Sequence, residues 1–175
     1  SIWHQCRFFG TAGGQHQRGA DFQLPQCQAH GQRTPYRTQF AGQRQFTREL
    51  EARGEGAIRW ALDWALTGDN AAALVAEISA AGKLVKDSLL IELAEDYPGD
   101  PGIVVALLLN RVTLTKGQAL YLPAGNMHAY IRGLGIELMA ASDNVLRGGL
   151  TSKHVDVPEL LSVVSDTVVP VPILE

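Results

Sequence analysis

The 175-residue sequence predicts an α+β fold: a helical segment packed on a partial antiparallel β-barrel, behind an irregular N-terminal segment. Three observations carry this prediction. Residues 1–45 have neither a helical nor a strand period, residues 46–104 place apolar residues at helical spacing, and residues 105–175 contain stretches that alternate as half-buried strands do. We expect these three ranges to be the parts of one domain, or of one domain with an appendage.

The N-terminal segment differs in composition from the rest of the chain. Ten of the eleven glutamines lie in residues 1–45, where Ile2 and Leu24 are the only branched aliphatic residues. Such a segment buries too little apolar surface to offset its ordering entropy, so we expect disorder. A reading frame or start site that was misassigned would give the same composition, and the sequence leaves both explanations open. The segment's net charge of +4 could also mark a nucleic-acid-binding arm, which we do not expect here.

Helical spacing begins at Phe46 and continues to about Leu66, with a break near Gly54–Gly56. A second helix is expected after Asp69 or Asn70, as far as Gly82. A third covers residues 83–97 and ends at the Pro/Gly-rich residues 98–102. Tryptophans and leucines at helical spacing usually mean burial, so we assign these stripes to the core.

The period changes after Gly102. Residues 104–115 read as a strand, Lys116-Gly117 as a turn, and residues 118–122 as the returning strand. Two more short strands are expected at 127–132 and 136–141. A short helix follows, with Asp156 as N-cap and Pro158 near its first position, and the chain then becomes extended.

Composition excludes several classes of protein. No apolar run is long enough for a transmembrane helix, and the first residues lack the apolar run of a signal peptide, so a cytoplasmic location is the default expectation. The two cysteines, Cys6 and Cys27, form no CxxC pair or disulfide framework, and we interpret them as free thiols.

A histidine stands in a Gly/Pro-rich loop of the pattern G-x5-P-x-G-x2-H, from Gly117 to His128. The pattern resembles the second metal motif of the cupin superfamily, in which a strand, a turn and a returning strand aim an imidazole into a barrel. Neutral imidazole is a good ligand for zinc. A hydrogen-bonded core histidine is the alternative interpretation of His128.

The stretches "LPAGNMHAY" and "GIELMAASDNVLRGGLTSKHVDVPELL" resemble the catalytic region of type I mannose-6-phosphate isomerase. The resemblance is dense from about Ala94 to Val164 and absent from residues 1–45. "SDNVLRGGLTSK" is its most specific part. The resemblance implies a cupin barrel with one zinc ion, and interconversion of mannose 6-phosphate and fructose 6-phosphate.

The resemblance also implies roles for single residues. It makes His128 a zinc ligand, Arg147 and Glu137 catalytic residues, and Lys153 and Tyr130 substrate-binding residues. Structural roles remain open alternatives: an ion-pair partner for Glu137, a loop clamp for Arg147, a solvated surface residue for Lys153.

The resemblance also covers three residues close to Arg147 in sequence. Asp143 and Asn144 are expected to shape the loop that presents Arg147. Ser152 stands where the family usually has proline, which loosens the loop through unfolded-state entropy without removing chemistry.

The family's other zinc ligands come from a Q-x-H motif and an Asn-His-Lys-Pro-Glu string, and the second does not occur in this sequence. Gln28-Ala29-His30 has the form Q-x-H without the surrounding signature. The resemblance therefore implies a fragment that supplies one zinc ligand and acts on a small-molecule sugar phosphate. An inactive fragment and a non-catalytic sugar-binding cupin module are the alternatives. No nucleic-acid or membrane partner is expected, and the sequence identifies no protein partner.

We expect His128, Glu137 and Arg147 to point into one cleft, because alternation along "GIELMA" puts Glu137 and Met139 on one face of a strand.

Overall fold

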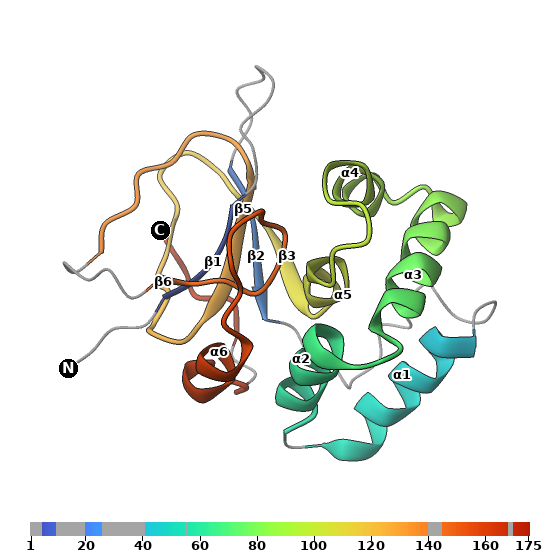
Figure 1. Ribbon diagram of the computed structural model, residues 1–175. Helices are drawn as coiled ribbons and strands as arrows, with labels where there is room; N and C mark the ends of the chain where they lie inside the picture. Colours follow the sequence, from blue (N-terminus) through green and yellow to red (C-terminus); the bar gives the residue numbers. More distant parts are fainter. Residues whose placement is uncertain (1–4, 10–19, 26–40, 55, 140–144, 168–169) are drawn as a thin grey trace.

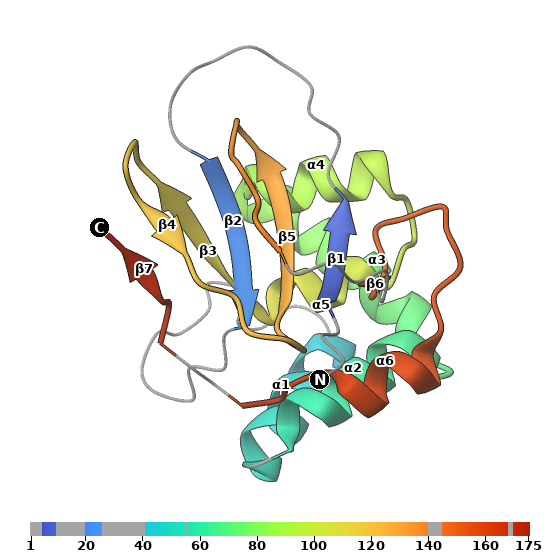
Figure 2. The same cartoon turned by 90° about the vertical axis from the view of Figure 1, so that its left-hand side faces the viewer.

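The computed structural model describes residues 5–9, 20–25, 41–54, 56–139, 145–167 and 170–175. Helices lie on one side of a five-stranded sheet, and the sixth helix lies beside its lower end (Figure 1). Turned by 90°, the molecule presents the sheet in front, with helices of the other layer behind it (Figure 2). The α+β class predicted from the sequence is therefore observed as two layers.

Five helices form the first layer: α1 (Ala41–Arg53), α2 (Ala57–Thr67), α3 (Ala71–Val85), α4 (Ser88–Asp96) and α5 (Gly102–Leu107). The predicted break between the first two is confirmed, with Gly54 and Gly56 at φ +57° and +84°. α1 begins before Phe46, inside the segment that we expected to be irregular.

The junction of α3 and α4 differs from the prediction. α3 continues through Gly82 and ends where Lys86 adopts a left-handed φ of 56°. A Cβ on Gly82 would lie 2.8 Å from Leu90 Cβ, so this glycine lets the two helices approach closely. Asp87 then caps α4, because its side chain accepts hydrogen bonds from the backbone N–H groups of Leu89 and Leu90 at 3.1 and 3.2 Å.

The prediction of a strand from residue 104 was wrong at its start. Residues 102–107 form α5, and the strand begins at Leu109. Ile103, Val104 and Val105 are completely buried. A continuous apolar run has no amphipathic period, so sequence alone does not separate a buried strand from a short buried helix.

The second layer is a sheet of β1 (Gln5–Phe9), β2 (Ala20–Pro25), β3 (Leu109–Leu114), β5 (Met127–Arg132) and β6 (Val145–Leu146). Its order is β3-β2-β5-β1-β6. β2 runs antiparallel to β3 and β5, whereas β1 runs parallel to β5 and β6. The sheet is therefore open and mixed, and not purely antiparallel as we expected.

The expectation of an irregular N-terminus was wrong for residues 5–9 and 20–25, which form β1 and β2. Their main-chain partners lie far along the chain, in β3, β5 and β6. Composition of the segment itself carries no sign of such distant partners, and tertiary context decides strand formation.

Two more strand predictions failed. The turn at Lys116-Gly117 is present, but β4 (Ala119–Leu120) pairs with β7 (Ile173–Leu174) and not with β3. Residues 134–139 belong to no strand. Leu134, Ile136 and Leu138 are each more than 90 % exposed there.

The helix α6 (Val157–Val163) is confirmed, including its cap: Asp156 accepts a hydrogen bond from the Glu159 backbone N–H at 3.1 Å. Arg59 of α2 joins this helix to the first layer. Its guanidinium donates to the carbonyl oxygens of Leu161 and Val164, and its Nε lies 3.1 Å from Asp166 Oδ2. Carbonyl groups near the end of a helix favour such a cation.

The core lies between the two layers. Side chains from α2, α3, α4 and α5 meet one face of the sheet there, and Phe46 of α1 stacks on Trp60 at 5.5 Å. No helix in the described part of the chain combines the length and the apolar character needed to cross a membrane.

Candidate functional site

The strand β5 divides its side chains between the two faces of the sheet. Met127 and Ala129 are buried in the core that faces the helices. Because successive side chains of a strand point to opposite faces, His128 and Tyr130 point away from that core. Their rings meet edge to face, with centroids 5.7 Å apart. The candidate site therefore lies on the face that is turned toward the viewer in Figure 2.

The turn before β5 fixes the imidazole of His128. The Asn126 backbone N–H donates to Pro123 O at 3.2 Å, and His128 Nδ1 donates to Asn126 O at 3.0 Å. A carbonyl can only accept, so Nδ1 carries the proton and the neutral ring keeps its lone pair on Nε2. The ring is 1 % exposed. A hydrogen-bonded core histidine would have this geometry. A metal-binding histidine would have it too, because such residues commonly donate one ring N–H to a carbonyl group and bind the metal through the other nitrogen.

Gly125 holds this turn against the end of α6. Its φ is +77°, and a Cβ there would lie 2.6 Å from Val163 O. The Ser165 backbone N–H also donates to Gly125 O at 2.9 Å. The glycine of the histidine motif thus serves both a left-handed turn and a close backbone contact.

Arg147 directly follows β6, which lies two strands away from β5 in the sheet. Cys6 of β1 pairs with Met127 of β5 on one side and with Leu146 of β6 on the other. Because both pairings are parallel, His128 and Arg147 are the residues that follow these two partners. Strand spacing puts their backbones about 10 Å apart, with β1 between them. Leu146 packs against the core that faces the helices, so alternation continued by one residue predicts that the half-buried Arg147 points to the same face as His128 and Tyr130.

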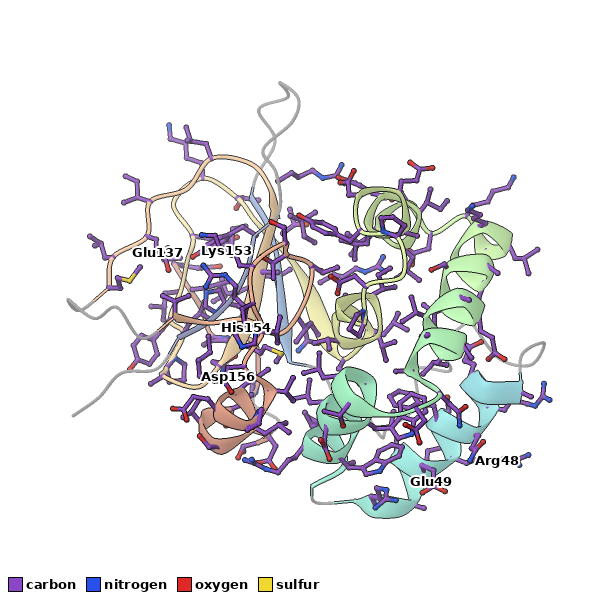
Figure 3. The ribbon with its side chains drawn as sticks, viewed as in Figure 1. Arg48, Glu49, Glu137, Lys153, His154 and Asp156 are labelled. Carbon is purple, nitrogen blue, oxygen red and sulfur yellow. The ribbon has the colours of Figure 1, made fainter. Side chains whose placement is uncertain are left out.

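The other predicted residues are less enclosed. Lys153 is exposed, and its backbone N–H donates to Thr151 Oγ1 at 3.1 Å. Glu137 is exposed too and belongs to no strand, which corrects our expectation that it stands on one face of a strand with Met139. Figure 3 shows Glu137 and Lys153 on the sheet side of the molecule, far from Arg48 and Glu49 of α1. A common cleft for His128, Glu137 and Arg147 stays a prediction.

Four residues discussed above lie outside the part of the chain that the structure describes: Gln28, His30, Asp143 and Asn144.

A zinc ion does not fit the donor set of the described residues. They include no group of three or more His, Cys, Asp or Glu side chains that could hold a metal ion. A protein zinc site needs three or four ligands, and His128 alone does not make one.

Sequence reasoning missed the residue that ties the Arg147 loop to the helices. Asp100 accepts a hydrogen bond from the Leu150 backbone N–H at 3.0 Å, across fifty positions of the chain. The available signal was an aspartate between two Pro/Gly pairs, in "PGDPG", which we interpreted only as a helix stop.

Comparison with known proteins finds relatives over part of the chain, although no protein-family profile matches it. The chain is 51 % identical over 80 residues to mannose-6-phosphate isomerase 2 of Arabidopsis thaliana, covering 46 % of this chain and 18 % of that protein. It is 51 % identical over 70 residues to the mannose-6-phosphate isomerase of Salmonella typhimurium, covering 40 % and 18 %. The human mannose-6-phosphate isomerase shares 43 % over 96 residues, covering 53 % and 23 %.

Solved structures agree with these relatives. The apo form of mannose 6-phosphate isomerase from Salmonella typhimurium superposes with a TM-score of 0.68 and 28 % identity, covering 85 % of this chain and 39 % of that one. A mannose 6-phosphate isomerase bound with zinc and yttrium gives the same values. The resemblance to mannose-6-phosphate isomerase is thus confirmed, and the chain spans about a fifth of the length of the curated relatives named above.

Proposed function

We propose that this chain supplies the substrate-side part of a mannose-6-phosphate isomerase, an aldose–ketose isomerase that interconverts mannose 6-phosphate and fructose 6-phosphate. The observation that carries the proposal is the 43–51 % identity to proteins of that name. The common face of His128 and Tyr130, to which alternation beyond β6 also assigns Arg147, supports it.

The chemistry of the reaction fits these residue types. Aldose–ketose isomerisation moves a proton between adjacent carbons and passes through an enediolate. The fixed, planar guanidinium of Arg147 suits an oxyanion or a phosphate. Lys153, a compact charge on a flexible stem, suits the phosphate. Glu137 would move the proton, a role for which a carboxylate must come within hydrogen-bond reach of the substrate carbon's proton.

The metal-side part of such a site is not provided by the described residues. His128 is one ligand, and zinc affinity comes from several ligands held in geometry at once. We therefore expect the purified chain to bind zinc very weakly and to convert no measurable mannose 6-phosphate. We expect the chain to bind a sugar phosphate through its substrate-side residues without converting it.

Calorimetric titration of the purified chain with mannose 6-phosphate, and with mannose, tests the proposal. We expect mannose 6-phosphate to bind at least about tenfold more tightly, because charge-assisted hydrogen bonds to a phosphate contribute roughly 1.5–3 kcal/mol each. Arg147→Ala and Lys153→Ala should each weaken binding by about tenfold or more. Arg48→Ala, which removes an exposed arginine of α1, is the matched control and should change nothing.

A coupled assay for fructose 6-phosphate, with zinc added, completes the test. Equal affinity for mannose and mannose 6-phosphate would overturn the proposed function. Turnover that depends on both zinc and Arg147 would show that the missing ligands are present in this chain, and Gln28 and His30 would be the first to replace.

A further inference from the structure

We propose that Asp100 is a positioning residue, which holds the loop of residues 147–153 in the conformation that presents Arg147 and Lys153. The inference rests on the proposed function for the roles of those two side chains. The anchoring itself rests on hydrogen bonds and backbone contacts that are independent of any function.

One carboxylate oxygen joins the loop to the helical layer. Asp100 Oδ1 accepts from the Gly102 backbone N–H at 2.7 Å and from the Leu150 backbone N–H at 3.0 Å. Leu150 is equally distant in sequence from Arg147 and Lys153. A single acceptor at the start of α5 therefore fixes the middle of the loop, and the loop reaches toward α5 in Figure 1.

Two glycines allow the backbones to meet at this point. A Cβ on Gly149, whose φ is +117°, would lie 2.6 Å from Gly102 Cα and 2.8 Å from Asp100 Oδ1. A Cβ on Gly102 would lie 2.7 Å from the Leu150 backbone nitrogen. Both distances are shorter than a Cβ atom permits. The two glycines therefore allow the loop backbone to contact the backbone at the start of α5.

Leu150 shows that the anchor constrains the loop. Its φ is +51°, in the left-handed region that leucine rarely adopts, and its side chain is 4 % exposed. Such a conformation persists only where the surroundings over-determine it. The hydrogen bond to Asp100 on one side and the buried side chain on the other supply that constraint.

The variants separate the hydrogen bond from the charge. Asp100→Ala removes the acceptor, whereas Asp100→Asn keeps an Oδ1 in the same place without the charge. Tyr97 reports on the charge: burial raises its pKa, and the carboxylates of Asp96 and Asp100 raise it further. The tyrosine pKa should fall in Asp100→Asn while the anchor remains. Asp96→Ala is the matched control for cleavage and binding, because it removes an exposed carboxylate from the same region; it should lower the Tyr97 pKa as well.

Limited trypsin digestion of the full chain, followed by mass spectrometry, measures the anchor. Trypsin cuts after Arg147 and Lys153, and cleavage of a closed loop follows the population of its open form. We expect Asp100→Ala to speed these two cuts about tenfold or more, with cuts after Arg59 and Lys83 inside helices unchanged. Asp100→Asn and Asp96→Ala should behave as the original chain does.

Binding of mannose 6-phosphate then tests the positioning role. We expect about tenfold weaker binding in Asp100→Ala and unchanged binding in Asp100→Asn. Unchanged cleavage in Asp100→Ala would overturn the anchor. A loosened loop with unchanged affinity would overturn the positioning role. A loosened loop in a chain whose original form binds no mannose 6-phosphate would leave the anchor standing and refute the proposed function instead.

Discussion

Gly125 and Gly117 have the same backbone requirement but different surroundings. Both adopt positive φ, +77° and +96°, in the loop that carries the histidine motif. A Cβ on Gly117 would meet nothing within 4 Å, whereas a Cβ on Gly125 would collide with Val163 O. The motif thus contains one glycine for conformation alone and one for conformation and contact.

Replacing each glycine by alanine separates these two effects. Gly117→Ala should lower the free energy of unfolding by about 1 kcal/mol, the cost of a left-handed non-glycine residue. Gly125→Ala should cost at least about 1 kcal/mol more, because the turn must also move away from α6. Urea unfolding of both variants gives the comparison, and equal losses would contradict the contact at Gly125.

Single residues with a local signature could be predicted from the sequence. The Asp156 cap lies just before a Pro-containing helix, and His128 is the last residue of a motif with a recognisable spacing. Glu137 was misjudged, because the expected strand at 136–141 needed a partner that no local pattern supplies. Asp100 was missed for the same reason: its partner, Leu150, is far away in sequence.

At the scale of elements, the N-terminal strands decide whether the sheet exists. β2 stands between β3 and β5, and β1 stands between β5 and β6. None of β3, β5 and β6 pairs directly with another of the three. The helices were predictable from their own period, because their hydrogen bonds are local. The sheet was not, because half of each strand pair lies in a segment whose composition favours disorder.

Deleting residues 1–40 tests this dependence. The shortened chain should keep hydrogen-exchange protection in α2 and α3, whose apolar contacts remain, and lose it in β3 and β5, whose main-chain partners are gone. Hydrogen exchange read by mass spectrometry resolves the two regions. Protected β5 amides in the shortened chain would mean that residues 1–40 are dispensable for the sheet, as an out-of-frame segment would be.

At the scale of the whole molecule, the exposed segment of residues 134–139 favours association between chains. Leu134, Ile136 and Leu138 alternate along it and are almost fully exposed, with Glu137 as its one charged residue. An exposed, apolar and weakly charged segment invites association with another chain.

We expect the chain to self-associate as its concentration rises, and Ile136→Lys to reduce this. A charge in the middle of the segment would have to be desolvated on pairing, which opposes association. Sedimentation velocity over a range of concentrations measures the effect. Leu84→Lys replaces a leucine that is also well exposed, on α3, and serves as control. An equal response to both substitutions would show that the segment has no special part in association.

The register of β1 also has a consequence for the order of folding during synthesis. Gln5 pairs with Val145 and Cys6 with Met127, so β1 closes loops of more than a hundred residues. Contacts between residues so far apart form slowly, because the chain loses the conformational entropy of closing the loop before any strand pairing stabilises it. On the ribosome the helices α1 to α4 emerge with their partners close behind them. β1 emerges earlier still and must wait, unpaired, until β5 and β6 have been made more than a hundred residues later. β1 is thus made before its partner strands β5 and β6 and is placed only after them.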